Sequence, residues 1–351
     1  MIYRPFLHLC LTVIVPSTIS FPAVWMVVVV AFSSPLFAED ENEEFYETYQ
    51  VLDSGPVDEQ FRRAQIDAGL AKLSDPNAWR RQSGIHLLAS WGSSEYAKAV
   101  APLLDDSDPG VRCSAINALL RLGGQPYVSQ IGARLNDSGE YSDEFGGRYP
   151  VKGCAARALG RLKAQEYTDT IASLSSDDAA FVRENAIFAL GELQAVQYAE
   201  RVAGYLNDPV PWVRGEAVST LVKLQVRDRV SEIAGLLRDD DDGVRYKAVK
   251  ALAQLGGMEH VRDIASLLDE PRPHRTDPGF LKHGEQVKGM AVQALGRLGA
   301  KEYERKIAKL LRYKDHFVAD SAAKVLSDWG LAKKYGIVRN PFSNPFELRN
   351  P

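Results

Sequence analysis

The chain has 351 residues, and its 42 lysines and arginines stand against 46 aspartates and glutamates, which gives a formal net charge of −4 at pH 7. This acidic balance disfavours a nucleic-acid-binding protein, because such a protein needs a basic stripe that releases counterions from phosphates. The three cysteines include no Cys-x-x-Cys spacing, so they do not make a zinc site.

Residues 1–38 predict an export signal. Arg4 is the only charged residue in this stretch, residues 21–32 are apolar apart from one proline, and Ala38 is a small residue directly before the acidic Glu39. An uncleaved membrane anchor is the alternative, and the prolines and the short apolar core argue against it. We therefore expect an exported protein of the bacterial periplasm or cell envelope, without a membrane span after signal removal. Loss of the single positive charge would take the net charge from −4 to −5.

Residues 39–57 are acidic and predict a flexible lead-in. Beyond them, a valine followed by a basic residue recurs along the chain. Successive copies lie 31 residues apart, with two longer steps of 40 and 43 residues. A period of this size is typical of stacked helical repeats. The copies are Arg80-Arg81, Val111-Arg112, Val151-Lys152, Val182-Arg183, Val213-Arg214, Val244-Arg245, Val287-Lys288 and Val318-Ala319, of which the first and last are degenerate.

The copy at Val111 shows what one repeat contains. Apolar residues at positions 0, 4, 7, 8 and 11 from this valine lie on one face of a helix, which Asp108 caps and Gly123 ends. Tyr127 and Ile131 begin a second amphipathic helix. Two helices of about 11 residues cannot bury their apolar faces alone, so we expect the hairpins to stack into one continuous core.

Residues 108–123 read Asp-Pro-x-Val-Arg-x-x-Ala-x-x-Ala-Leu-x-x-Leu-Gly, which resembles the short HEAT-like repeat of the phycobilisome-lyase (PBS lyase) type. The resemblance covers residues 58–338 and implies an all-α fold, an α-solenoid (superhelix) of about eight two-helix repeats. It implies no particular function, because this scaffold carries many unrelated activities. We expect the basic residue after each valine to pair with the turn aspartate of an adjacent repeat.

The two long steps follow the second and the sixth copies, so we interpret the solenoid as a block of four repeats that occurs twice, about 58–193 and 194–338. Each block has one enlarged turn, at 136–150 in the first and at 269–286 in the second. Long loops on a rigid frame often carry binding residues, so we predict partner contacts there. The alternative is that the loops only cover an edge of the solenoid. The predicted contact residues of the two loops are Tyr141, Phe145, Tyr149, His274 and Phe280.

Positions 2, 6 and 9 after each valine are predicted to line the concave side of the solenoid. Several of them are glycines, which indicates either tight curvature or close approach by a bound chain. Phe188 and Tyr246 are the predicted aromatic anchors for such a chain.

Cys113 and Cys154 lie in neighbouring Val-Arg helices, at positions 2 and 3 after the valine. A cross-link between them is conceivable in an oxidising compartment. Because the two positions differ, we expect one side chain to point to the concave face and the other to its flank. This expectation disfavours a disulfide.

An array of eight repeats in two blocks of four also resembles deoxyhypusine hydroxylase. That resemblance implies a di-iron site held by His-Glu pairs directly after the Val-Arg element. No His-Glu pair occurs in this sequence, and nothing in it singles out a pigment pocket like that of the phycobilin lyases. His274 and His283 share a loop with acidic residues, but a solvated loop explains them better than a metal does. We therefore predict no catalytic residue, no cofactor and no metal.

Residues 339–351 form a C-terminal tail that either folds back on the last repeat or stays loose. The sequence predicts an exported, non-enzymatic scaffold that binds a protein or peptide partner through the concave groove and the two enlarged loops. The alternative is an enzyme or enzyme-accessory subunit of the HEAT-like lyase or hydroxylase type. Nucleic acid is not an expected partner.

Overall fold

The computed structural model describes residues 59–142, 146–269, 283–338 and 347–348. The chain forms two compact units, Met1–Gln65 and Ile66–Pro351, and α1 (Glu59–Lys72) contains the boundary between them. The predicted signal segment and lead-in lie outside the described residues. So do three predicted contact residues, Phe145, His274 and Phe280.

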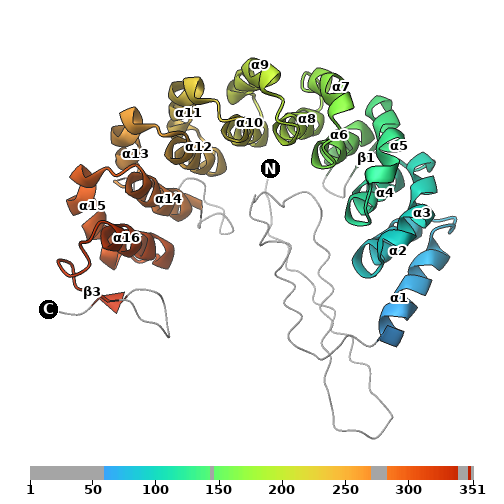
Figure 1. Ribbon diagram of the computed structural model, residues 1–351, viewed down its shortest axis with the longest axis horizontal. Coiled ribbons are helices and arrows are strands. Elements are labelled where there is room, and N and C mark those ends of the chain that lie inside the picture. Colours follow the sequence, from blue (N-terminus) through green and yellow to red (C-terminus); the bar gives the residue numbers. More distant parts are fainter. Residues whose placement is uncertain (1–58, 143–145, 270–282, 339–346, 349–351) are drawn as a thin grey trace, which may run out of the picture. The chain divides into compact units, whose positions relative to one another are not determined.

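Eight long helices of the second unit carry the valine-basic copies, and we call them the inner helices. Each packs against the next one along the chain, from α2 on α4 to α14 on α16. Figure 1 shows them as one row of this unit, with a row of shorter helices outside it. The predicted all-α solenoid is confirmed. The inner helices are α2 (Ala78–Trp91), α4 (Pro109–Arg121), α6 (Val151–Arg161), α8 (Ala180–Glu192), α10 (Pro211–Lys223), α12 (Asp242–Leu255), α14 (His283–Arg297) and α16 (His316–Asp328).

The helices of the second row, which we call the outer helices, are shorter than the sequence indicated. Around α9, the flanking turns Val196–Tyr198 and Tyr205–Asn207 are 3₁₀ helices. Bonds from residue i to i+3 tighten the ends of a helix and satisfy terminal backbone groups. Val202 and Leu206 stay buried, so the amphipathic pattern is kept. The outer helices are α3 (Ala97–Val100), α5 (Val128–Ala133), α7 (Thr168–Leu174), α9 (Ala199–Gly204), α11 (Val230–Gly235), α13 (Val261–Ser266) and α15 (Glu304–Ala308).

The core lies between the two rows, and its residues come from the predicted columns. The valine that opens an inner helix is fully buried at Val111 and Val213, and so are outer-helix residues such as Ile131 and Ile233. The same positions are buried in the other repeats, except that the first inner helix has the exposed Arg80 at the valine position. The buried side chains form one continuous cluster along the unit. This continuity stabilises each hairpin through its neighbours.

The ends of the inner helices follow the expected capping pattern. Asp108 precedes α4, and its Oδ1 accepts a hydrogen bond from the backbone amide of Val111 at 2.9 Å. Asp241 and Asp315 cap α12 and α16 in the same way. Gly123 follows α4 with φ of +89°, a conformation that glycine adopts without a side-chain clash. The predicted helix boundaries are therefore confirmed at this repeat.

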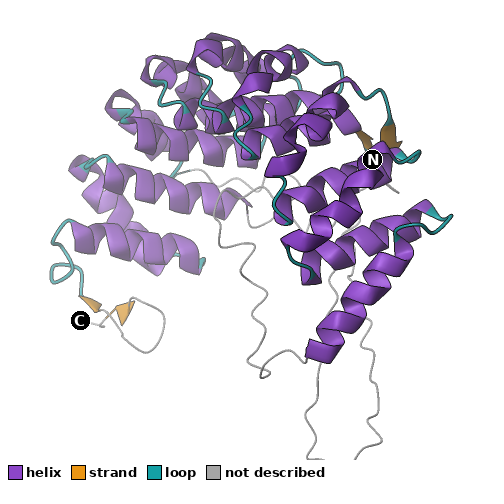
Figure 2. Cartoon of the chain, turned by 45° about the vertical axis from the view of Figure 1, so that its right-hand side comes forward, coloured by secondary structure: helices purple, strands orange, loops and turns teal. Residues whose placement is uncertain are grey.

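The first enlarged turn contains a β-hairpin that the sequence analysis did not predict. β1 (Glu140–Ser142) and β2 (Arg148–Pro150) pair antiparallel, with Tyr141 opposite Tyr149. Aromatic pairs of this kind stabilise two antiparallel strands, and Gly146 takes a positive φ in the connection. Figure 2 shows how little strand the described chain contains beside its helices.

The tail and the second enlarged turn are described in part. β3 (Ile337–Val338) pairs antiparallel with β4 (Glu347–Leu348), so residues 347–348 of the tail fold back beside the end of the last repeat. In the second enlarged turn, α14 begins at His283, so the last four residues of the expected loop are helical. Residues 270–282 lie outside the described residues.

Candidate functional site

In five repeats, the basic residue at the position after the valine pairs with an aspartate 25 residues later, in the turn before the next inner helix. Nε and Nη2 of Arg183 donate to Oδ2 and Oδ1 of Asp208 at 2.9 and 3.0 Å. This two-pronged arrangement matches the planar guanidinium to the carboxylate. The predicted ladder is therefore confirmed in these five repeats, whereas Lys288, at the same position of α14, donates to Oη of Tyr313. The ladder pairs are Arg81–Asp106, Arg112–Asp137, Lys152–Asp177, Arg183–Asp208 and Arg214–Asp239.

Each of the four ladder arginines also donates to a carbonyl of the turn before its own helix. Nη1 of Arg183 donates to the carbonyl of Asp177 at 3.0 Å, and Asp208 accepts a further hydrogen bond from the amide of Val210. At Asp106, burial alone would raise the carboxyl pKa, but hydrogen bonds from Arg81 and from a backbone amide outweigh it and leave the pKa lowered. The donors and acceptors of the ladder are thus used within the fold, and the ladder is structural.

The glycines at positions 2 and 9 correct our expectation about the concave surface. A Cβ atom built on Gly153 would lie 2.7 Å from the Phe181 ring, and one on Gly160 would lie 2.6 Å from Cα of Ala189. Phe181 and Ala189 belong to α8, the next inner helix. These glycines therefore allow neighbouring helices to approach closely, and the idea that they admit a bound chain is wrong at these positions.

These glycines contact the next inner helix, and not the concave surface, because of the way parallel helices stack. A helix meets its successor with one flank and its predecessor with the other, so the contacting positions on the two partners differ. Arg157, at position 6 of α6, donates to Oδ1 of Asn185, at position 3 of α8, at 3.2 Å. Gln293 and Ser321 repeat the same pairing at 2.9 Å between α14 and α16.

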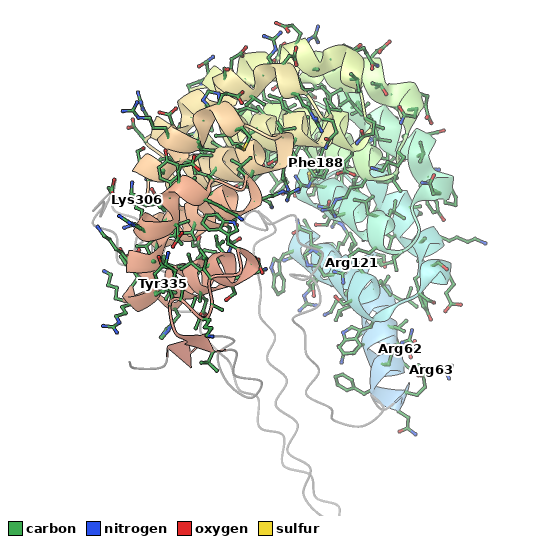
Figure 3. The ribbon with its side chains drawn as sticks, turned by 60° about the vertical axis from the view of Figure 1, so that its left-hand side comes forward. Arg62, Arg63, Arg121, Phe188, Lys306 and Tyr335 are labelled. Atoms are coloured by element: carbon green, nitrogen blue, oxygen red, sulfur yellow. A yellow bond between two sulfur atoms is a disulfide. The ribbon has the colours of Figure 1, made fainter. Side chains whose placement is uncertain are left out.

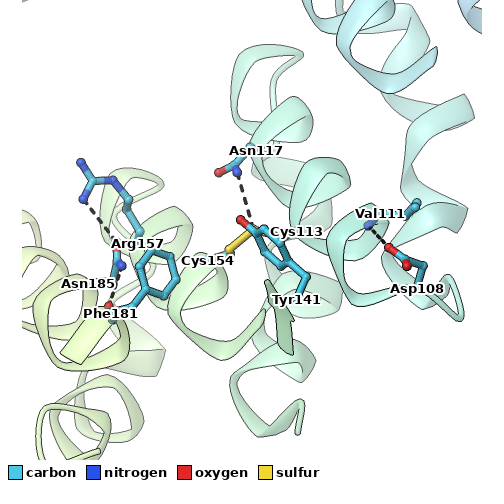
Figure 4. Close-up of a disulfide and its surroundings, with 9 residues drawn as sticks. All are labelled: Asp108, Val111, Cys113, Asn117, Tyr141, Cys154, Arg157, Phe181 and Asn185. Carbon is cyan, nitrogen blue, oxygen red and sulfur yellow. Dashed lines mark hydrogen bonds between the residues drawn. A yellow bond between two sulfur atoms is a disulfide. The ribbon is translucent and has the colours of Figure 1, made fainter. Parts of the chain in front are cut away.

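The same geometry overturns our expectation about the cysteines. Cys113 and Cys154 form a disulfide between α4 and α6, with their Cα atoms 5.8 Å apart. Position 2 of one helix faces position 3 of the next, so the difference in position that argued against a bond is what the stacking requires. Figure 4 shows the disulfide, with the Tyr141 ring beside it.

The tyrosines of the first hairpin lie against the inner helices. Oη of Tyr141 donates to Sγ of Cys113 at 3.8 Å, and the Tyr141 and Tyr149 rings are 5.2 Å apart. Tyr149 in turn meets the Phe181 ring edge-on at 5.2 Å. Both tyrosines are half-buried. The hairpin thus packs on the inner helices, with β1 against α4 and β2 against α6 and α8.

Phe188 lies on α8 with three cations around its ring. The guanidinium carbon of Arg157 is 4.2 Å from the ring centre, Nζ of Lys223 is 4.6 Å from it, and the guanidinium carbon of Arg161 is 5.8 Å from it. Phe188 is only 7% exposed, so an approaching molecule meets the cations before the ring. Figure 3 places Phe188 on the side of the second unit that the inner helices form. Tyr246, the other predicted anchor, is half-buried on α12 against the core.

These cations were not among the site residues predicted from the sequence. The sequence does contain a pattern that indicates them, because lysines and arginines recur at positions 6 and 10 after the valine position of the inner helices. These positions lie opposite the buried positions 0, 4, 5 and 8 of the same helix. Across the eight inner helices they hold seven cations and two carboxylates, although acidic residues are in excess in the whole chain. The cations are Arg121, Arg157, Arg161, Lys223, Lys250, Arg297 and Lys324.

Within the described ranges, no group of three or more His, Cys, Asp or Glu side chains is placed to hold a metal ion. None of the helices placed by the structure has the length and apolarity to cross a membrane. His86 on α2 has a lowered pKa, because burial and the charge of Arg121 both disfavour its protonated form.

Comparison with known proteins identifies the repeat. A family model for HEAT repeats matches residues 66–141, 147–222 and 198–276. Among solved structures, YibA from Escherichia coli is 15% identical over 78% of this chain and 97% of its own, with a TM-score of 0.54, which shows a shared fold. No curated protein matches the chain.

Two further structures are similar at lower TM-scores. The CpcE–CpcF complex of phycocyanin lyase from Nostoc sp. PCC7120 is 21% identical, covers 66% of this chain and 86% of its own, and has a TM-score of 0.43. Human deoxyhypusine hydroxylase in complex with glycerol is 17% identical, covers 79% of this chain and 99% of its own, and has a TM-score of 0.33.

Proposed function

Because this chain belongs to the HEAT-repeat family, we propose that it is an exported, non-enzymatic scaffold that binds a protein or peptide partner along its inner helices. Solenoids of stacked helices present extended surfaces of this kind. One observation carries the proposal. Arg157, Phe188 and Lys223 come from three consecutive inner helices and meet at one point, so neighbouring repeats build a shared surface.

The partner-binding residues of the proposal fall into two groups. Phe188 and Tyr246 lie on inner helices, and Phe188 acts there as the support of a charged surface. Tyr141 and Tyr149 contribute as the half-buried base of the first hairpin. The enlarged turn at 269–286 remains the predicted contact region of the second block, and its residues 270–282 lie outside the described residues.

Export rests on two supports. The predicted signal at 1–38 directs the chain to the bacterial periplasm or envelope. The Cys113–Cys154 disulfide fits an oxidising compartment, because cytosolic thiols are kept reduced. The mass of the native protein tests this part: a chain that begins at Glu39 is expected, and a protein recovered in the cytosol with its first residues intact would contradict it.

Site-specific photo-crosslinking tests the binding surface. Asn117 is exposed at position 6 of α4, and Ser231 is exposed on the outer helix α11. A photoreactive phenylalanine analogue at position 117 should crosslink to a protein partner in intact cells, whereas the same group at position 231 should not. Equal crosslinking from both positions, or none from position 117, would argue against an inner binding surface.

The non-enzymatic part of the proposal is tested on purified protein. We expect no stoichiometric metal and no bound pigment by elemental analysis and absorption spectroscopy. Iron or a chromophore at one equivalent per chain would instead favour an enzyme or an enzyme-accessory subunit.

A further inference from the structure

The basic side chains of the inner helices fall into two groups with different surroundings. The ladder arginines, such as Arg183 and Arg214, each have an aspartate partner. In contrast, no carboxylate in the described part of the chain forms an ion pair with the cations at positions 6 and 10, apart from Lys223. This second group consists of Arg121, Arg157, Arg161, Lys250, Arg297 and Lys324.

The cations are held most closely around Phe188. Arg157 stacks over the ring at 4.2 Å, and Nη1 of the same side chain donates to Asn185. Asn185 is itself held, because its Nδ2 donates to the carbonyl of Phe181 at 2.7 Å. The ring face attracts cations. Arg157 is thus fixed in place, and no acceptor among the described residues is bound to Nε or Nη2 of its guanidinium.

One carboxylate adjoins this cluster, and it is shared. Glu192, at the end of α8, accepts from Nζ of Lys163 at 2.6 Å and from Nζ of Lys223 at 2.8 Å. Burial would raise the pKa of Glu192, but the two lysines outweigh it and leave the pKa lowered. Glu192 stays ionised and satisfies the lysines. Arg157 and Arg161 gain nothing from it in the described contacts.

Helix dipoles explain only part of the pattern. Arg161 and Lys223 are the last residues of α6 and α10, where a positive charge stabilises the helix end. Arg157 lies more than a turn earlier, so this effect does not account for it. On α4, Arg121 is exposed and continues the basic surface toward the first repeats (Figure 3).

We propose that the cations of the inner helices, centred on Arg157 and Arg161 around Phe188, bind an acidic segment of a protein partner through its aspartate and glutamate side chains. The proposal rests on the proposed function and deepens it. Guanidinium groups form two parallel hydrogen bonds with a carboxylate, and an aromatic support leaves that edge available. A nucleic acid fits less well, because Glu192 lies on the same surface and the chain as a whole carries net charge −4.

A defined probe tests this inference. A fluorescent peptide of alternating glutamate and glycine is titrated with the full chain at low and at physiological ionic strength, and anisotropy reports binding. We expect binding that weakens with salt, because screening reduces attraction between exposed charges. A lysine–glycine peptide should not bind. An oligothymidylate of matched charge should bind more weakly than the acidic peptide.

Matched variants identify the surface. The double variant Arg157→Gln and Arg161→Gln should lower the affinity for the acidic peptide about tenfold, since each loses a charge-assisted contact. The control Arg262→Gln and Arg305→Gln removes the same charge from exposed positions on α13 and α15 and should leave affinity unchanged. The single variant Arg161→Gln changes an exposed residue and should cause a smaller loss of affinity for the acidic peptide. It replaces the double variant in the test if the double variant does not fold.

Three results would overturn the proposal: no binding of the acidic peptide, equal losses in the two double variants, or tighter binding of the oligonucleotide. The crosslinking experiment at position 117 distinguishes failure of the acidic-segment proposal from failure of the proposed scaffold function. If a protein is captured there while the acidic peptide does not bind, the charge assignment is wrong and the scaffold function stands. If neither occurs, both are wrong.

Discussion

Removing the Cys113–Cys154 disulfide should destabilise the protein measurably. The two cysteines are 41 residues apart in sequence and join α4 to α6 across the first hairpin. Cys113→Ala with Cys154→Ala breaks the bridge, and reduction of the wild type breaks it without changing the sequence. The two side chains are only 2% and 4% exposed, so the alanine variant also leaves small cavities.

The magnitude follows from the size of the closed loop. In the chain-entropy model, a cross-link over this separation reduces the entropy of the unfolded chain by about 13 cal/mol/K, which corresponds to about 4 kcal/mol at 25 °C. The cavities add a smaller cost of about 1 kcal/mol. Reduced wild type should therefore lose about 4 kcal/mol in free energy of unfolding, and the double variant slightly more.

Urea unfolding followed by circular dichroism measures this loss, with and without reductant. The variant with both Cys113→Ala and Cys154→Ala is the control. Reductant should not change its free energy of unfolding, because at most Cys10 remains as a cysteine and it has no intramolecular cysteine partner. Hydrogen exchange adds a local test. Each repeat depends mainly on its neighbours, so protection should fall in α4 and α6 and stay nearly unchanged in α14. A loss under 1 kcal/mol on reduction, or a loss spread evenly over all repeats, would refute the reasoning.

Two further predictions test the packing and the ladder. Gly160→Ala should destabilise the protein by about 1–3 kcal/mol, because the added Cβ would meet the backbone of Ala189. Gly204 has no neighbouring atom where a Cβ would lie, and its φ of −57° is helical. Gly204→Ala should therefore be neutral or stabilise the protein by up to about 1 kcal/mol. Equal urea midpoints for the two variants would contradict the close helix contact. The pKa of Asp106 and that of Asp137 are lowered in the fold, so their stabilisation is present above about pH 4 and is lost as pH falls through the folded pKa values. The urea concentration at the unfolding midpoint should therefore decrease when the pH is lowered below about 4. The double variant Asp106→Asn and Asp137→Asn should show a smaller decrease, and an equal decrease in wild type and variant would refute this prediction.

The sequence alone contained most of the architecture. The 31-residue period indicated the number of repeats, and the position of Val111 relative to Asp108 and Gly123 indicated where a helix begins, ends and buries its face. The pairing of Arg183 with Asp208 was also predictable, because a constant spacing of 25 residues places the partners in neighbouring turns. These features follow from local helix geometry and from repetition.

Only the tertiary structure decided how neighbouring inner helices face each other. Periodicity identifies the side of a helix that meets its own outer partner, but the flank that meets the next repeat depends on the rotation between stacked helices. That rotation turned Gly160 from a supposed groove residue into a packing contact, joined Cys113 to Cys154, and gathered Arg157 and Lys223 around a ring from a third helix. Such contacts join residues about 30 to 70 positions apart, beyond the reach of any local pattern.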